Sequence, residues 1–399
     1  MPWKEQDTMD LRTKFALEAI QSDANISDLC RKYGISRPTG YKWRDRLLEQ
    51  GLAGFHELSR APQSSPTQLT EQQACALIRI KNAHPNWGPA KIRAIYLRGR
   101  PDLEPVSLSS VKRVLERAGL VRKRKRRTRT SAGRLFSERK ASACNEVWTV
   151  DFKGHWRCRD LSRCEPLTIR DEYSCYLLVV DAMVSARTED VQRCFECLFR
   201  KHGLPGAIRS DNGSPFANGS SVWGITRLSA WFLSLGIDLE RSRPGKPQDN
   251  GAHERMHLDI AKEVERQPAL SLKEQQTALD IWKEEFNEIR PHEALGMRTP
   301  SEVYTSRSEK WDGTTETLVY ARKQSRKVNK LGEISWKSDR YRISTALQGQ
   351  QVGLEPSATP GLVRVWYGEL LLGELEPSTH RFIRADEGPD KARPLHVSA

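Results

Sequence analysis

The chain has 399 residues with a formal net charge of +14, and hydrophobic residues make up 37% of it. A chain of this length holds about three domains. No apolar run approaches the roughly 18 residues that a membrane helix needs, and the first ten residues lack the apolar core of a signal peptide. Eight cysteines without a secretory signal indicate reduced thiols. We therefore expect a cytoplasmic protein with no membrane partner.

The positive charge is concentrated in the first third of the chain. Residues 1–140 contain 29 Lys and Arg against 14 Asp and Glu, a net charge of +15, so the rest of the chain is close to neutral. Clustered basic residues favour a polyanionic partner, and nucleic acid is the simplest one.

Residues 10–56 predict a helix-turn-helix domain. A short helix over 26–33 is followed by Gly34, which suits the turn, and by Ser36, which can cap the next helix. The expected core residues are Leu29, Ile35, Trp43 and Leu47. The candidate DNA contacts on the second helix are Arg37, Thr39, Lys42 and Arg44. The alternative is an unrelated three-helix unit with a basic face.

A linker, a second helical unit and a basic arm follow. Residues 57–69 are rich in Ser, Pro and Gln and predict a linker, and residues 70–120 predict a second helix-turn-helix-like domain that begins with a capping box at Thr70. Residues 121–143 form a basic arm, which we expect to contact phosphates or, alternatively, to be a solvated linker. Its seven basic residues in eight positions are Arg122, Lys123, Arg124, Lys125, Arg126, Arg127 and Arg129.

The second half of the chain predicts two more domains. Residues 144–306 alternate between strand and helix patterns after an initial three-stranded meander, which is typical of a mixed α/β sheet. Residues 320–378 contain only short strand patterns and predict a small SH3-like β-barrel. Residues 385–399 predict a disordered tail. The expected fold is therefore multidomain, with all-α units, an α/β core and a β-barrel.

Three acidic residues of the α/β region can form one site. Asp211 ends a short strand in IRSDNGSPF, Asp151 lies inside the apolar strand VWTVDFKGHW, and Glu254 begins a helix after Asn250-Gly251. Taken alone, Asp211 is better explained as a turn residue than as a catalytic one, since Asp-Asn-Gly is a strong turn sequence. Three carboxylates at one edge of a sheet would repel one another, and a divalent metal with oxygen ligands, Mg²⁺ or Mn²⁺, relieves that repulsion.

With these carboxylates in place, the sequence resembles the DDE transposases of bacterial insertion sequences, whose core is similar to that of retroviral integrase and has the ribonuclease H fold. The resemblance runs from about residue 10 to residue 375, with the segments in the family's order. The matching segments are GISRPTGYKW, EQGLAGF, HPNWGPAKIRA, NEVWTVDFKGHW, EPLTIRDEYSCYLL, FRKHGLPGAIRSDNGSPF, RPGKPQDNGAHERMH and NEIRPHEALGMRTP.

The resemblance implies a function and a site. Asp151, Asp211 and Glu254 would be a catalytic triad that binds two Mg²⁺ or Mn²⁺ ions and cleaves and joins DNA. The residues that would shape the site are Asn212, Gly213, Asn250 and Gly251. The segment from Asn287 to His292 is similar to the family's closing motif and would be structural or near the site. The partner would be double-stranded DNA, both the terminal repeats of a mobile element and its target, bound by a dimer or larger homo-oligomer in the bacterial nucleoid.

Other interpretations of the same pattern are a DNA-binding regulator descended from a transposase, with an inert core, and a structure-specific nuclease of the same fold. A nucleoid protein with a purely structural role would not need three acidic residues at these places. Metal-dependent cleavage separates an enzyme from a regulator, and joining of DNA ends separates a transposase from a nuclease.

The basic arm gives a testable prediction. If it and the adjoining domains neutralise about eight phosphates, the logarithm of the DNA-binding constant should fall with the logarithm of the salt concentration with a slope of about −7. A binding titration at several salt concentrations measures this slope. A slope near zero would remove the arm from the DNA-binding surface.

Overall fold

The computed structural model of the chain describes residues 8–56, 69–99, 106–121, 140–241, 251–315, 317–320 and 323–387. The predicted basic arm from Arg122 to Arg129, most of the 57–69 linker and Asn250 lie outside these residues. The chain divides into two compact units, Met1–Gln68 and Leu69–Ala399, which are described separately below. Among the described residues, no helix is both long and apolar enough to cross a membrane. All eight cysteines are free thiols.

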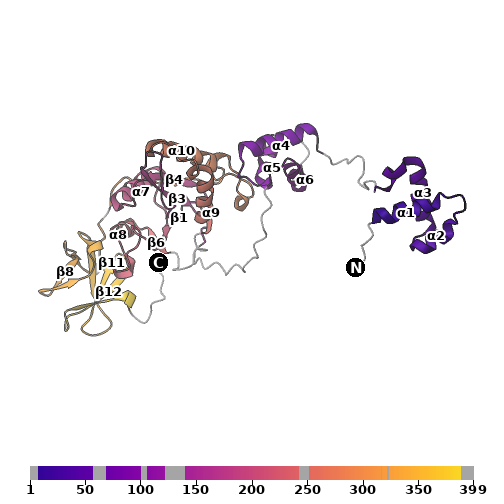
Figure 1. Ribbon diagram of the computed structural model, residues 1–399. Coiled ribbons are helices and arrows are strands. Elements are labelled where there is room, and N and C mark those ends of the chain that lie inside the picture. Colours follow the sequence, from indigo (N-terminus) through magenta and orange to yellow (C-terminus); the bar gives the residue numbers. More distant parts are fainter. Residues whose placement is uncertain are drawn as a thin grey trace. The chain divides into compact units, whose positions relative to one another are not determined.

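The first unit is the predicted helix-turn-helix. Its helices are α1 (Thr8–Ala19), α2 (Ile26–Tyr33) and α3 (Arg37–Gln50), followed by a 3₁₀ turn, Gly51–Phe55 (Figure 1). Gly34 ends α2 in the left-handed region at φ 66°, and the Ser36 side chain accepts from the Thr39 amide and caps α3. Both local signals in the sequence therefore act as expected.

The core of this unit requires a glycine in α3. A Cβ atom on Gly40 would lie 2.5 Å from Cys30 Sγ and 2.9 Å from Phe15 Cζ, so any side chain at this position would push α3 away from α1 and α2. Trp43 is 5% exposed in the same cluster, and the other three expected core residues, Leu29, Ile35 and Leu47, pack around it.

The second unit begins with three more helices, α4 (Glu71–Ala83), α5 (Pro89–Arg98) and α6 (Leu108–Arg117). Thr70 and Gln73 form the capping box, with the Thr70 hydroxyl accepting from the Gln73 amide and the Gln73 side chain accepting from the Thr70 amide. The cluster that joins the helices is formed by Leu77, Trp87, Ile92, Tyr96, Val106, Val111 and Leu115.

The core sheet has the strand order β4-β3-β1-β5-β6, and the short β2 pairs with the first residues of β3. Its strands are β1 (Val147–Phe152), β2 (Trp156–Arg157), β3 (Arg163–Asp171), β4 (Leu177–Met183), β5 (Ala207–Ser210) and β6 (Asp238–Arg241). The β1-β3-β4 meander is antiparallel, whereas β5 and β6 run parallel to β1. This is the ribonuclease H-like arrangement that the resemblance implied.

Helices cover both faces of this sheet (Figure 1). The core helices are α7 (Thr188–His202), α8 (Arg227–Ser234), α9 (Gly251–Ile260) and α10 (Leu272–Glu284). Helices α7 and α8 pack on the face that presents Trp148 and Val150 of β1. Helices α9 and α10 pack on the face that presents Val180 and Ala182 of β4. Alternation of side chains along β1 therefore points Asp151 to the face that α9 covers.

Asn287 secures the outer strand β4. It lies in a π-helical segment, Glu285–Ile289, that continues α10, and it is 3% exposed. Its Oδ1 accepts from the Leu177 amide and its Nδ2 donates to the Leu177 carbonyl, both at 2.9 Å. The Asn287 side chain thus takes the place of a neighbouring strand for one residue of β4.

The C-terminal region is all-β, as expected, but the described strands do not form a closed barrel. The strands are β7 (Gln324–Lys327), β8 (Glu333–Trp336), β9 (Asp339–Arg342), β10 (Gln351–Pro356), β11 (Val363–Tyr367), β12 (Leu370–Glu376) and β13 (Arg381–Arg384). Five strands form an open antiparallel sheet in the order β13-β12-β11-β10-β7, and β8-β9 is a separate hairpin. Ile334 and Tyr341 of the hairpin pack into the hydrophobic core of the five-stranded sheet. This packing takes the place of the strand pairing that would close a barrel.

The first three residues of the expected disordered tail are ordered. Residues 385–387 form a 3₁₀ turn in which Asp386 pairs with Arg384 and accepts from the Trp223 amide at 2.8 Å. The expectation of disorder from residue 385 is therefore wrong for these three residues, and residues 388–399 lie outside the part of the chain that the structure describes.

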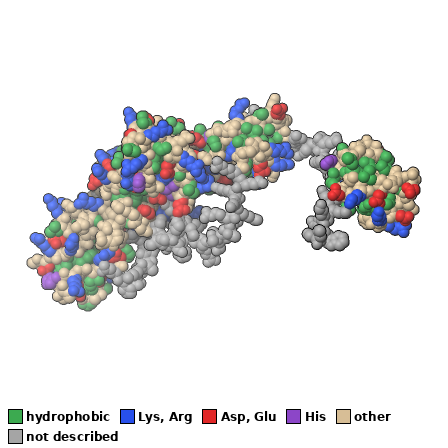
Figure 2. Space-filling model, viewed as in Figure 1, with side chains coloured by type: hydrophobic (Ala, Val, Ile, Leu, Met, Phe, Trp, Pro, Cys, Tyr) green, Lys and Arg blue, Asp and Glu red, His purple; other side chains and the backbone are tan. Residues whose placement is uncertain are grey.

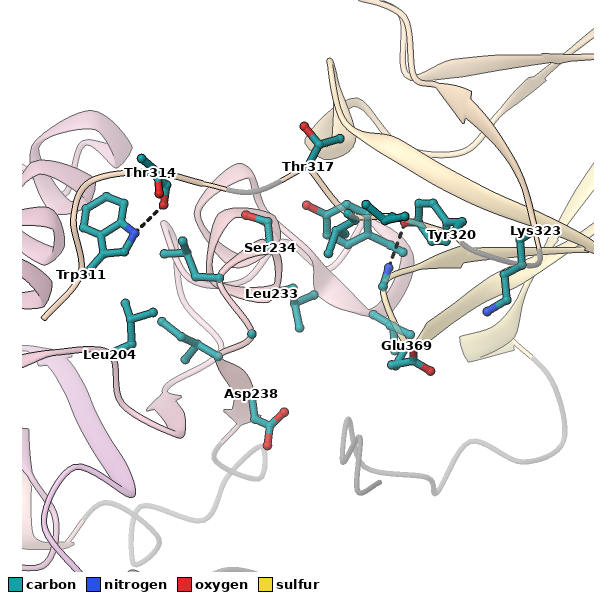
Figure 3. A pocket seen from close by; sticks show the side chains of 18 of the residues that line it. Leu204, Leu233, Ser234, Asp238, Trp311, Thr314, Thr317, Tyr320, Lys323 and Glu369 are labelled. Carbon is teal, nitrogen blue, oxygen red and sulfur yellow. Dashed lines mark hydrogen bonds between the residues drawn. The ribbon is translucent and has the colours of Figure 1, made fainter. Parts of the chain in front are cut away.

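A cavity of about 900 Å³ lies between the core and the C-terminal sheet (Figure 3). Trp311 and Tyr320 line it, Trp311 Nε1 donates to the Thr314 carbonyl, and Tyr320 Oη accepts from the Gly368 amide. Asp238 also lines the cavity, which therefore lies at the start of β6. Figure 2 shows Lys and Arg side chains spread over the visible face of the second unit.

Asn287→Ala should destabilise the chain by about 2–4 kcal/mol, because it leaves the buried amide and carbonyl of Leu177 without partners. Urea unfolding of the full-length chain measures this loss. Asn82→Ala, on an exposed position of α4, is the matched control and should change the free energy of unfolding by less than about 0.5 kcal/mol. Equal effects of the two substitutions would contradict the role given to Asn287.

Candidate active site

Asp151 and Asp211 lie at the ends of neighbouring parallel strands. The register pairs Val147 with Ala207 and Thr149 with Arg209, an offset of 60 residues. Carried on by two residues, this offset sets Asp211 beside Asp151, and neighbouring strands are about 4.8 Å apart. Asp211 directly follows β5 and is exposed, whereas Asp151 is partly buried inside β1. Both carboxylates thus belong to the edge of the sheet where α/β folds bind ligands.

The turn after Asp211 depends on Gly213. The Gly213 amide donates to Asp211 Oδ1 at 3.1 Å, and a Cβ on Gly213 would lie 2.9 Å from Asp211 Oδ2. A side chain at position 213 would therefore displace the carboxylate. Asn212, between Asp211 and Gly213 in the sequence, is exposed. Asp211 therefore stabilises the turn through its Oδ1 and also presents its carboxylate at the strand end.

Two arginines near Asp211, Arg209 on β5 and Arg241 on the neighbouring β6, were not among the predicted site residues. Arg241 pairs with Ser210 across β5 and β6, and it donates to Ser229 Oγ at 3.2 Å. Burial lowers the pKa of Arg241 to about 10, and the charge of Asp211 opposes that shift. Arg241 therefore places a positive charge next to the Asp211 carboxylate.

The second arginine, Arg209, is 8% exposed and lies two residues before Asp211. Its Nη1 donates to Glu172 Oε1 at 2.6 Å and its Nε donates to Glu240 Oε2 at 2.8 Å. These bonds tie β5 to β6 and to the β3-β4 turn. The signal in the sequence was a charged residue inside a short buried strand, the same signal that identified Asp151.

Glu254 lies in the first turn of α9 and is exposed. One turn further, His257 Nε2 is 2.9 Å from Thr168 Oγ1, and Thr168 donates to the Asp151 carbonyl at the same distance. Asp151 is therefore linked through Thr168 and His257 to the turn of α9 that carries Glu254.

The histidines of α9 are uncharged at neutral pH. Burial lowers the pKa of His257 to about 4, with a further contribution from Lys153, and burial lowers the pKa of His253 well below its usual value. His253 is completely buried. These residues hold α9 against the sheet as neutral rings.

The three carboxylates have the oxygen donors that Mg²⁺ and Mn²⁺ prefer. The strand register brings two of them together, and the third is on the helix that covers the same face. Within the described residues, however, no three His, Cys, Asp or Glu side chains are gathered closely enough to hold a metal ion. The chemistry of the donor set fits a divalent cation, and its third member, Glu254, is on a helix rather than at a strand end. Gly251, one of the residues predicted to shape the site, is the first residue of α9 and is exposed.

The four α3 side chains that were predicted to contact DNA differ in their exposure and in their hydrogen bonds to other residues. Arg37 and Lys42 are exposed. Thr39 is partly buried, and its hydroxyl is 2.8 Å from that of the capping Ser36. Arg44 makes two bonds to Asp45, at 2.9 and 2.7 Å. Arg37 and Lys42 are therefore the side chains of this set that can reach a ligand without giving up an interaction with Asp45 or Ser36.

Five family models match segments along the chain, some of which overlap. Residues 11–62 match a helix-turn-helix domain and residues 39–115 a homeodomain-like domain. Residues 141–247 and 235–300 match two models of the integrase core domain, and residues 323–381 match the C-terminal domain of IS481 family transposases. Together these matches support a bacterial insertion-sequence transposase with an integrase-like core. The recognition made from the sequence motifs is thereby confirmed.

Proteins similar to this chain come from bacterial insertion elements. An uncharacterized 39.2 kDa protein of insertion element IS476 from Xanthomonas euvesicatoria is 24% identical over 63% of this chain and 70% of its own length. An uncharacterized 31.7 kDa protein of insertion element IS407 from Burkholderia multivorans is 26% identical over 72% of this chain and 93% of its own. Among solved structures, the HTLV-2 integrase catalytic core domain in complex with magnesium aligns with 42% of the chain at 16% identity and a TM-score of 0.33.

If the chain cleaves DNA with Mg²⁺, as the predicted triad implies, Gly213→Ala should lower that cleavage about 10- to 100-fold, because the new Cβ displaces the Asp211 carboxylate. Nicking of a supercoiled plasmid measures the rate. Gly219→Ala is the matched control from the same loop, since a Cβ there meets no atom within 4 Å. The two variants should have similar melting temperatures. Full cleavage by Gly213→Ala would show that the position of the Asp211 carboxylate is not critical.

Proposed function

We propose that this transposase binds the ends of a mobile DNA element, cleaves the phosphodiester bond at each end and joins the ends to target DNA. The observation that carries the proposal is the parallel register of β1 and β5, whose continuation sets Asp211 beside Asp151 at the edge of the sheet. Two carboxylates from adjacent strand ends, with a third on the helix that covers them, are the donor set that metal-dependent phosphoryl transfer requires.

In this proposal Asp151, Asp211 and Glu254 hold two Mg²⁺ or Mn²⁺ ions. When bound, the ions lower the pKa of the attacking water and stabilise the charge on the leaving oxygen. The water oxygen attacks phosphorus and the bond from phosphorus to the 3′ oxygen breaks, which leaves a 5′ phosphate on one product and a 3′ hydroxyl on the element end. The water proton passes to solvent, and the leaving oxygen takes up a proton.

The second step uses the 3′ hydroxyl of the element end as the nucleophile. It attacks a target phosphate, one new phosphodiester bond forms and one target bond breaks, so the number of phosphodiester bonds is conserved. No covalent bond to the protein is needed, and no Ser, Tyr or Cys nucleophile is assigned. The backbone turn of Asn212 and Gly213 orients Asp211, and the neutral His257 orients the Asp151 backbone through Thr168.

The partner in this proposal is double-stranded DNA, as terminal repeats and as target. Arg37 and Lys42, which are exposed on α3, would reach base edges, and the 122–129 arm would contact phosphates. Two element ends must meet for joining, so the working form would be a dimer or a larger homo-oligomer on DNA. A location at the bacterial nucleoid follows from this partner.

The second candidate is a DNA-binding regulator with an inert core. In its favour, the part of the chain that the structure describes has no group of three His, Cys, Asp or Glu side chains able to hold a metal ion. The regulator would bind DNA as tightly as the enzyme does but would release no cleaved product when Mg²⁺ is added. A nuclease of the same fold would cleave and would not join.

Asp211→Asn should lower plasmid nicking and end joining by about 100- to 1,000-fold, because one anionic ligand of the metal ions is lost while the amide keeps its size. The assay is supercoiled plasmid DNA with Mg²⁺, scored for nicked and joined products. Asp160→Asn, in the exposed turn between β2 and β3, is the control and should retain activity. Full cleavage by Asp211→Asn would reject the triad, and DNA binding without cleavage by the wild-type chain would favour the regulator.

A further inference from the structure

We propose that Arg290 is a positioning residue for catalysis: it fixes helix α9 and thereby the place of Glu254. This inference rests on the proposed function, since it requires Glu254 to be a ligand of the metal ions. Arg290 is far from the strand ends in sequence, yet it is 1% exposed and is bound to the helix that carries Glu254.

Helix α9 presents two acids to Arg290. Asp259 is 8% exposed near the end of α9, five residues after Glu254. The helix continues as a π-helical segment, Ala261–Glu265, which contains Glu263. Residues four apart lie on the same side of a helix, so Asp259 and Glu263 form one acidic site on α9 and its continuation. π-Helical segments are frequent at functional sites, because the wider turn redirects side chains.

The Arg290 guanidinium bridges these acids. Its Nη1 donates to Asp259 Oδ2 at 3.1 Å, and its Nη2 donates to Glu263, which also accepts from Trp282 Nε1 at 2.7 Å. A planar guanidinium can hold two carboxylates in a fixed geometry, whereas the single ammonium of lysine cannot. The bridge therefore sets the rotation and the tilt of the end of α9.

Aromatic rings fix the guanidinium in turn. Its carbon lies 5.4 Å from the ring centre of Phe286 and 5.6 Å from those of Trp282 and Trp87. Trp87 belongs to the α4–α6 helical unit and is stacked on His84 at 3.8 Å. His84 is hydrogen-bonded to Glu285 of the core at 3.1 Å. The helical unit thus supplies one wall of the Arg290 site.

The placement of Glu254 follows from this anchoring. Besides its apolar contacts, α9 and its continuation are held by Arg290, by the ion pair of Lys153 with Glu265, and by His257 on Thr168. All of these polar contacts lie on the C-terminal side of Glu254, which is exposed in the first turn of the helix. Loosening the Arg290 bridge would let the helix tilt and would reduce the fraction of molecules in which Glu254 can join the other two carboxylates. The apparent affinity for metal falls in proportion to that fraction.

The test compares full-length Arg290→Lys with the wild type. We expect the Mg²⁺ concentration for half-maximal plasmid nicking to rise about 10-fold, while the rate at saturating Mg²⁺ stays within about 2-fold. A second readout uses Mn²⁺ alone, without DNA, and measures bound ion by electron paramagnetic resonance; its affinity should fall by the same factor. Hydrogen exchange should quicken in peptides of α9 and remain unchanged in α7.

Arg298→Lys is the matched control, because Arg298 is exposed and donates to the Leu295 carbonyl within its own turn. It should leave the Mg²⁺ requirement, the Mn²⁺ affinity and the hydrogen exchange of α9 unchanged. Glu263→Gln is a milder second variant that weakens one arm of the bridge and keeps a hydrogen-bond acceptor. It should shift the Mg²⁺ requirement in the same direction, by about 3-fold, and it decides the matter if Arg290→Lys does not fold.

The outcomes separate this inference from the proposed function. If Asp211→Asn is inactive while Arg290→Lys and Glu263→Gln keep the wild-type Mg²⁺ requirement and α9 exchange, the positioning role is refuted and the proposed function stands. If Asp211→Asn retains full cleavage, the proposed function fails, and the inference fails with it. A fall in the rate of Arg290→Lys at saturating Mg²⁺, without any change in Mg²⁺ requirement or Mn²⁺ affinity, would also overturn it.

Discussion

The parallel pairing of β1 with β5 is the constraint on which the rest of the core depends. It joins the antiparallel β1-β3-β4 meander to the parallel pair β5-β6, and it brings the end of β5 beside the end of β1. A carboxylate inside an apolar strand is costly to bury, and Asp151 lies near the strand's end, where it is only partly buried. The pairing that builds the sheet is thus the pairing that sets two acidic residues side by side.

Local signals were enough to predict the elements around this sheet. Gly34 and Ser36 mark the turn and the cap of α3, and Thr70 and Gln73 mark the start of α4, because each acts on backbone groups within a few residues. Asp211 could be placed at the end of a strand for the same reason, since the turn sequence that follows it shows where the strand ends. The integrase-type core followed from the order of such segments along the chain and from their resemblance to a family.

Long-range contacts could not be predicted in this way. The barrel expected for the C-terminal region is an open sheet with a hairpin packed on it, and this depends on which edges of short strands meet. The bridge from Arg290 to Asp259 and Glu263 links side chains some 30 residues apart through a π-helical segment, and no periodicity in the sequence announces that segment. Arg209 was overlooked because its partners, Glu172 and Glu240, lie on two other elements.

Two aspartates at opposite ends of the sheet, Asp171 and Asp211, show that the surroundings of a carboxylate decide whether it stabilises a turn or remains available to a ligand. Asp171, at the end of β3, is completely buried; it accepts from the Asn145 amide at 2.7 Å and from the amide and hydroxyl of Ser174 at 2.8 and 2.6 Å. Because its oxygens are occupied by donors from the chain, it serves to close the β3-β4 turn. Asp211 is exposed and accepts from the Gly213 amide, so its carboxylate still faces solvent. The contrast explains why an acidic residue at a strand end is a candidate ligand only where the fold leaves oxygen atoms available, and β5 ends at such a place.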